Sequence, residues 1–146
     1  MVMRRFWVAV GVITVLPSLA ACGEAATPTP LLETRVSVEV SEFLVESMVV
    51  QNGPGKTTFF VTNHGAIAHE FLVVRTDVPA SDLLVVSEQV DLAQAGTVAG
   101  RIGTEDLQPE ASGFLQLDLE PSAYALICNI PGHYEAGMWA GFTLAN

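Results

Sequence analysis

The sequence has few basic residues, no internal repeat and a modest length, and each of these features excludes a class of protein. Six lysines and arginines stand against 16 aspartates and glutamates, and only four of the basic residues follow Cys22. A body this acidic is repelled by a phosphate backbone, so we expect no nucleic-acid partner. The chain has no internal repeat, and 146 residues are too few for two ordinary domains. Half of the residues are hydrophobic, which is enough for one domain with a sandwich-sized core.

The N-terminus has the features of an export signal. Arg4 and Arg5 precede an uncharged, largely apolar stretch over residues 6–20. This stretch is short for a membrane span and is broken by Pro17. It leads into Leu-Ala-Ala-Cys, ending at Cys22, which resembles the bacterial lipobox. In that kind of signal a peptidase cuts before the cysteine, which then carries lipid.

We therefore predict a lipoprotein signal peptide at 1–21, lipidation of Cys22, a tether over 22–33 and a domain at 34–146. The tether is small, aperiodic and contains proline. An ordinary secretory peptide and a short membrane anchor are the alternatives, and all three place the domain outside the cytoplasm. Under the lipoprotein interpretation, lipid is the only link to the envelope membrane, on its periplasmic or outer face.

Alternation of apolar and polar residues predicts a series of short strands. Val36, Val38 and Val40 alternate with polar residues, as in a half-buried strand. The segment 81–94 is ambiguous, since it fits a short helix or an irregular crossover that contains a strand. Many short strands with frequent turns predict an all-β fold, an antiparallel Greek-key β-sandwich. The strands are expected near residues 36–40, 57–62, 71–74, 115–119, 124–128 and 138–144.

A segment near the C-terminus brings together residues that bind soft metals. It runs from Cys128 through His133 to Met138, and it offers a thiolate, an imidazole and a thioether at spacings of five and five. Two histidines and a cysteine in one plane, with a long axial methionine, are typical of blue-copper sites. The second histidine has to be His64 or His69, because the chain contains no others.

Each of these residues, taken alone, has an ordinary explanation. Cys128 could be a small buried hydrophobe, Met138 part of the core, and His133 an exposed loop residue. With Cys22 lipidated, however, Cys128 is an unpaired thiol in an oxidising compartment, where such a thiol is usually protected, reactive or bound to metal. The joint pattern therefore indicates ligands. Pro131-Gly132 predicts a tight turn that brings His133 back over Cys128.

The two motifs resemble those of the cupredoxins, the single-domain type 1 copper proteins. The spacing is most similar to the rusticyanin, auracyanin and sulfocyanin branch, whose upstream motif Asn-x-Gly-x-x-x-His matches residues 63–69. The resemblance extends from about residue 36 to residue 144 and implies a cupredoxin-like sandwich. It leaves His64 as a surface loop residue. It implies one copper ion, cycling between Cu(I) and Cu(II), with four ligands: His69, Cys128, His133 and Met138.

The resemblance also implies that Asn63, Glu70 and Asn129 surround the ligands. Several cupredoxins have Asn or Ser directly after the first histidine, where it helps to hydrogen-bond the thiolate. Glu70 stands at that position here. Its backbone N–H can still donate to sulfur, but a carboxylate near the thiolate shifts the electronic properties of the site.

Four protein ligands leave no open coordination position for a substrate, so we expect an electron carrier and not an enzyme. One cysteine in the loop excludes a dinuclear copper centre, and three histidines exclude a multicopper oxidase. We expect single electrons to pass by outer-sphere transfer to and from extracytoplasmic protein partners of cytochrome or oxidase type, which dock near His133. The acidic surface steers a basic partner or serves only solubility. The alternatives are an envelope protein for copper storage, delivery or tolerance, and a metal-free sandwich.

Overall fold

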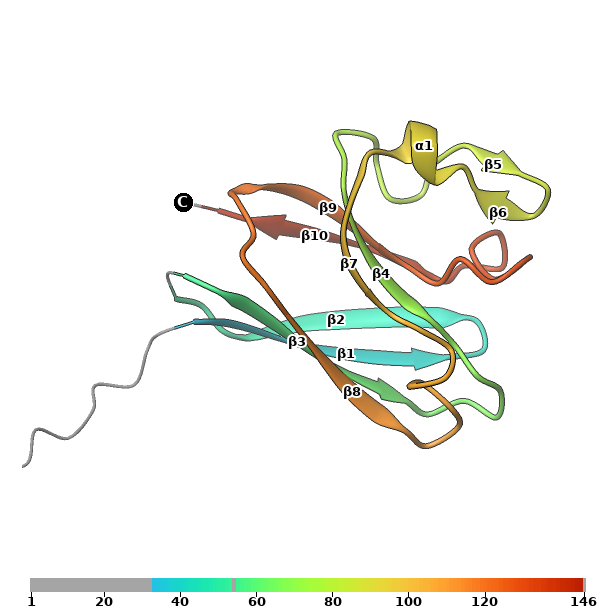
Figure 1. Cartoon of the computed structure of the whole chain (residues 1–146), viewed down its shortest axis with the longest axis horizontal. Coiled ribbons are helices and arrows are strands. Elements are labelled where there is room, and N and C mark those ends of the chain that lie inside the picture. Colours follow the sequence, from blue (N-terminus) through green and yellow to red (C-terminus); the bar gives the residue numbers. More distant parts are fainter. Residues whose placement is uncertain (1–32, 54, 146) are drawn as a thin grey trace, which may run out of the picture. The chain divides into compact units, whose positions relative to one another are not determined.

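The structure is a computed structural model that describes residues 33–53 and 55–145. The predicted signal peptide, Cys22 and nearly all of the tether lie outside the described residues. In the described part, two four-stranded sheets pack face to face, with a small two-stranded hairpin and one short helix beside them (Figure 1). No helix among these residues is both long enough and apolar enough to cross a bilayer.

The sheet order is that of a Greek-key sandwich. The first sheet has the order β2 (Leu44–Gln51), β1 (Thr34–Ser41), β3 (Thr57–Asn63) and β8 (Ser112–Leu117). The second has the order β10 (Trp139–Leu144), β9 (Ser122–Ile127), β4 (Phe71–Arg75) and β7 (Thr97–Ile102). The chain changes sheets after β3, β7 and β8. The predicted all-β sandwich is confirmed, with one added feature: β1 and β3 pair in parallel, whereas the other neighbours are antiparallel.

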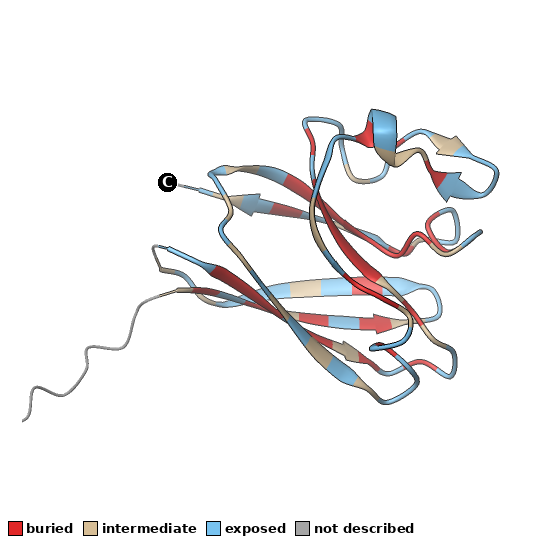
Figure 2. Ribbon diagram, viewed as in Figure 1, coloured by how far each residue is buried: buried red, intermediate tan, exposed pale blue. Residues whose placement is uncertain are grey.

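The core lies between the inner faces of the two sheets. Val36, Val38 and Val40 of β1 are buried there, while Ser37 and Glu39 point outward, as the alternation predicts. Figure 2 shows the same alternation of buried and more exposed positions along several strands. The opposing sheets contribute large side chains to this core: Phe59, Val61, Phe71, Val73, Tyr124, Leu126 and Phe142.

The ambiguous segment forms an irregular crossover between β4 and β7. It contains the short hairpin β5 (Val85–Val86) and β6 (Gln89–Val90), followed by the single-turn helix α1 (Leu92–Ala95). Asp91 begins this helix, because its side chain accepts a hydrogen bond from the Ala93 N–H. Both features considered for the segment are therefore present, and the helix is confined to a single turn at its end.

The crossover packs against the second sheet and forms a smaller core there. Leu83, Val90 and Ala95 are buried against residues of β4 and β9 that point away from the main core. Leu72 and Ile127 are among those strand residues. Burial on both faces explains why Phe71–Val74 is a continuous apolar run instead of an alternating one.

Candidate metal centre

Three of the four predicted ligands continue the inward-facing rows of neighbouring strands. His69 lies two residues before Phe71 of β4, and Cys128 lies two residues after Leu126 of β9. Met138 directly precedes β10. Side chains two residues apart on a strand share a face, so these ligands point into the sandwich. All three are 0% exposed.

The pairing of β9 with β10 places Cys128 opposite Met138. Trp139 pairs with Ile127, and the next step of the ladder is a hydrogen bond of 3.1 Å from the Cys128 N–H to the Met138 carbonyl. The thiol and the thioether thus come from adjacent positions on the inner face of one sheet. In Figure 1 the β9–β10 loop, the β3–β4 loop and the β1–β2 turn lie at the same end of the sandwich.

His133 reaches the site from the turn between β9 and β10. Its N–H donates to the Ile130 carbonyl over 3.0 Å, and the Met138 N–H donates to the His133 carbonyl over 3.1 Å. Gly132 has a φ of 80°, a left-handed conformation that favours glycine. The tight turn expected from Pro131-Gly132 is therefore present, and it brings His133 to Cys128.

The structure brings His69, Cys128 and His133 together. Their ligand atoms all lie within 4.8 Å of one another. The Cys128 Sγ is 4.0 Å from the His69 Nδ1 and 3.5 Å from the His133 Nδ1. The two imidazole rings have centroids 5.2 Å apart. Each ring therefore directs Nδ1 toward the sulfur and leaves Nε2 on its far side.

The chemistry of these donors fits copper. A thiol and a thioether are soft ligands, and imidazole suits copper well, whereas magnesium and calcium prefer oxygen. Apart from His133, which is 8% exposed, the four side chains have no contact with solvent. The surroundings can therefore shield a bound ion from water.

Burial sets the protonation of the three groups. It raises the pKa of the Cys128 thiol, and the Glu70 N–H beside the sulfur partly opposes this rise. Burial lowers the pKa of His69 and of His133 below the ordinary value. At neutral pH the metal-free pocket thus contains a thiol and two neutral imidazoles, and the thiol loses its proton when it binds a metal.

The residues expected around the ligands lie there, and each one holds a neighbouring segment in place. The Asn63 side chain donates to the carbonyls of Ile67 and Leu107 and accepts from the Gly65 N–H, so it braces the loop that precedes His69. The Glu70 N–H lies 3.5 Å from the Cys128 Sγ. The expected donation from the backbone to sulfur is therefore geometrically available.

Asn129 and Glu70 join the ligand loop to other parts of the sandwich. Glu70 Oε1 accepts from the Asn129 N–H over 3.1 Å, while burial raises the pKa of this carboxyl. The Asn129 side chain accepts from the Val90 N–H over 2.6 Å and donates to the Val90 carbonyl over 3.2 Å. The Gly132 N–H donates to the Glu88 carbonyl over 2.8 Å. The β5–β6 hairpin and the ligand loop are therefore one hydrogen-bonded unit.

Two residues of the β1–β2 turn contact the histidines and were not predicted from the sequence. Glu42 Oε1 lies 3.4 Å from the His69 Nε2, and the Phe43 ring meets the His133 ring edge-on at 5.2 Å between centroids. An acidic residue and an aromatic residue in a hairpin turn carry no metal signal by themselves. Only the strand topology places them beside loops that are distant in the sequence.

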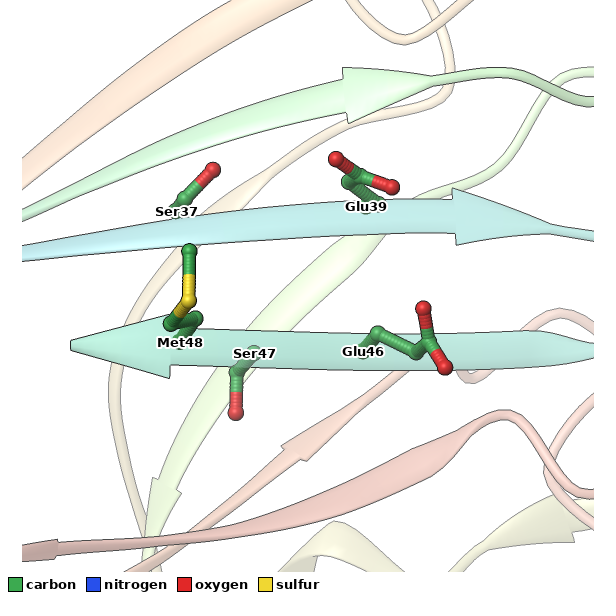
Figure 3. A pocket seen from close by; sticks show the side chains of 5 residues that line it. All are labelled: Ser37, Glu39, Glu46, Ser47 and Met48. Atoms are coloured by element: carbon green, nitrogen blue, oxygen red, sulfur yellow. The ribbon is translucent and has the colours of Figure 1, made fainter. Parts of the chain in front are cut away.

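His64 stays outside the cluster and is exposed, as expected from the resemblance. A shallow hollow on the outer face of β1 and β2 also lies apart from it. Figure 3 shows Glu39 and Glu46 there on neighbouring strands, together with Ser37, Ser47 and Met48. Glu39 and Glu46 face each other in the strand register, and the hollow contains no histidine or cysteine. It is not the metal centre.

Comparisons with known proteins agree with this architecture. Residues 52–146 match the family model of the sulfocyanin (SoxE) domain. A comparison with curated proteins finds no match. Similar solved structures include dithionite-reduced auracyanin from the photosynthetic bacterium Roseiflexus castenholzii, with a TM-score of 0.55 and 17% identity over 77% of this chain and 98% of that chain. Rusticyanin from Thiobacillus ferrooxidans has a TM-score of 0.51 and 16% identity over 77% of each chain.

At 16–17% identity, the likeness to these structures establishes the fold alone. The sulfocyanin-domain match covers more than half of the chain and establishes the family. The two findings agree with the donor set on the inner face of the second sheet. The chain belongs to the sulfocyanin (SoxE) domain family of cupredoxins, and copper is the cofactor that its cluster of His69, Cys128, His133 and Met138 fits.

Proposed function

We propose that the protein carries single electrons between redox partners outside the cytoplasm, on one copper ion held by His69, Cys128, His133 and Met138. The proposal depends on one observation, the close approach of the His69 and His133 Nδ1 atoms to the buried Cys128 sulfur. A copper ion bound there supplies a one-electron couple between its cuprous and cupric states.

The placement of the ligands supports a carrier over an enzyme. Three of them extend strands of a packed sheet, and closely packed interiors resist movement, so little rearrangement accompanies a change of charge at the site. Four protein ligands also leave no position for a substrate or an activated water.

The region around His133 supports docking of a partner there. It is the only one of the four ligands that has contact with solvent, and Phe43 beside it is exposed. Ile67 and Trp139, which are close in sequence to the ligands His69 and Met138, also expose apolar surface. Apolar and aromatic residues are typical of interface cores. We propose that a partner of cytochrome or oxidase type docks on this surface.

Spectroelectrochemical titration of the copper-loaded protein tests the proposal. We expect an intense visible thiolate-to-copper absorption that bleaches on reduction, returns on oxidation and is lost in Cys128→Ser. The matched control is His64→Ala, which changes an exposed histidine and should leave the absorption unchanged. A colourless copper-loaded protein would contradict the proposal.

A role in copper storage, delivery or tolerance predicts a different result. Such a protein gives up its ion readily, so a chelator would remove copper quickly and reversible reduction by a cytochrome would not be observed. Burial of His69, Cys128 and Met138 argues for slow release, and hence for the carrier.

A further inference from the structure

The far side of the His69 ring presents a polar atom that needs a partner. Among the described residues, His69 Nε2 is completely buried and makes no well-formed hydrogen bond. The carboxylate oxygen Oε1 of Glu42 lies 3.4 Å away, slightly beyond the usual range for an N–H···O bond. A buried donor without an acceptor is costly, so Glu42 is the group that can satisfy this nitrogen.

The carboxylate of Glu42 is held in this position by the loop that carries His69. Its Oε1 accepts the Ile67 N–H over 2.9 Å, and this hydrogen bond is the main reason that the pKa of Glu42 lies below its ordinary value. The side chain is 29% exposed, so it is partly sheltered but not enclosed. Glu42 is thus a charged acceptor on the rim of the site.

Gly65 provides the space for this carboxylate. A Cβ placed on Gly65 would lie 2.5 Å from Glu42 Oε1 and 2.8 Å from Oε2, closer than real Cβ contacts. The backbone of Gly65 needs no left-handed conformation, so its missing side chain, and not its torsional freedom, is what the structure uses. This assigns a role to the glycine of the Asn63-x-Gly65 motif.

We propose that Glu42 is a positioning residue of the metal centre. Its carboxylate accepts a hydrogen bond from the Nε2–H of His69, and Gly65 leaves the space that the carboxylate occupies. His69 is thereby held in the tautomer whose bare Nδ1 is directed at Cys128. A carboxylate in this position orients the ring and raises the basicity of the ligand nitrogen. Its negative charge also favours the more highly charged state of an ion bound by His69.

The proposal builds on the copper site, but its first test needs no metal. In the metal-free protein, two-bond ¹H–¹⁵N correlation spectra report which ring nitrogen of His69 carries the proton. We expect the Nε2–H tautomer in the wild type and a mixture of tautomers in Glu42→Ala. An unchanged single tautomer in Glu42→Ala overturns the proposal, whatever the function of the site.

Copper affinity, measured by chelator competition, gives the second readout. Loss of a hydrogen-bond partner of a metal-binding histidine typically lowers affinity about 10- to 100-fold, which is the loss expected in Glu42→Ala. Glu42→Gln keeps an oxygen acceptor and should lose less. Gly65→Ala retains the charge of Glu42 but displaces the carboxylate, so it should lose as much copper affinity as Glu42→Ala. It provides a second test if Glu42→Ala folds poorly.

The reduction potential separates positioning from general stability. We expect it to rise in Glu42→Gln, because a negative charge next to His69 is removed. Glu46→Gln makes the same charge change on the outer face of β2 and is the matched control. The proposal would be overturned if Glu42→Gln, Gly65→Ala and Glu46→Gln had the same reduction potential and copper affinities within twofold of one another.

Discussion

At the scale of single residues, the site depends on where each ligand lies along its strand. Cys128 and Met138 face each other across the β9–β10 ladder, so their side chains start from neighbouring positions on the inner face of the sheet. Met138 is also part of the main core. Its contribution to packing and its contribution to the metal can therefore be separated by a substitution that preserves volume.

Met138→Leu should leave the fold intact and raise the reduction potential. Exchanges of Met and Leu usually cost less than about 1.5 kcal/mol in unfolding free energy. Removing the thioether takes away a donor and makes the pocket more apolar, which disfavours the cupric state. Voltammetry and thermal unfolding of the copper-loaded variant provide the measurements. A potential equal to that of the wild type would show that Met138 is not a ligand.

The buried histidines predict how the stability of the metal-free protein changes with pH. Burial lowers the pKa of His69 and His133 below 6.5, so below that pH the unfolded chain binds more protons than the folded one. Stability should therefore fall as the pH drops from about 6.5. Burial raises the pKa of Glu70 above 4.5, which acts in the opposite sense.

Urea unfolding of metal-free Glu70→Gln at a series of pH values above 5 tests the histidine effect, because the lowered pKa of Glu42 changes stability mainly below that range. The glutamine keeps the acceptor for the Asn129 N–H and removes the opposing carboxyl. A constant free energy of unfolding between pH 7 and pH 5 would be inconsistent with neutral, buried imidazoles.

At the scale of secondary-structure elements, the crossover between β4 and β7 braces the ligand loop. The Asn129 side chain pairs with both backbone groups of Val90, and the Tyr134 hydroxyl donates to the Ala80 carbonyl and accepts from the Leu83 N–H. An irregular segment with only a two-stranded hairpin and one helical turn thus determines how firmly the His133 turn is held.

Asn129→Ala should loosen this brace. It leaves the N–H and the carbonyl of Val90 without their partners, and an unsatisfied buried group costs about 1–3 kcal/mol. We expect lower stability in urea and faster amide exchange at Val90 and Gly132. Thr143→Ala, at an exposed position of β10, is the control. Exchange rates as slow as those of the wild type would show that the crossover does not hold the loop.

Some of the strands and some of the residues around the metal centre could be predicted from the sequence, and others could not. The strands with a clear alternation and the residues of the buried cluster that fits copper were predictable, because neighbouring residues carry those signals. β2 and β7 were not singled out, since neither shows a clear alternation: β2 has the consecutive exposed apolar residues Met48, Val49 and Val50, and β7 contains Gly100. Glu42 and Phe43 were missed for another reason, because only the packing of strands distant in the sequence brings them to the histidines.

At the scale of the whole molecule, the residues predicted to attach the protein to the membrane are separate from those predicted to bind copper. The predicted signal at 1–21 and Cys22 precede the described domain, and the predicted ligands lie far along the chain. Changing the anchor should therefore move the protein without altering its copper site.

Cys22→Ser should prevent lipidation and reduce the amount of protein in the membrane fraction. Fractionation of bacterial cells and mass spectrometry of the mature N-terminus provide the measurements. Cys128→Ser is the matched control, because it replaces the other cysteine and should stay with the membrane. Equal partitioning of the two variants would argue against a lipid anchor at Cys22.

The hydrogen bond between Cys128 and Met138 closes the base of the loop that carries His133. Since the sheet ladder holds both ends of this loop, we expect changes within it to move His133 more than the two sulfur ligands at its base. The solvent-facing ligand and the surface offered to partners can thus be altered through the loop, while the packed interior of the sandwich holds the sulfur ligands.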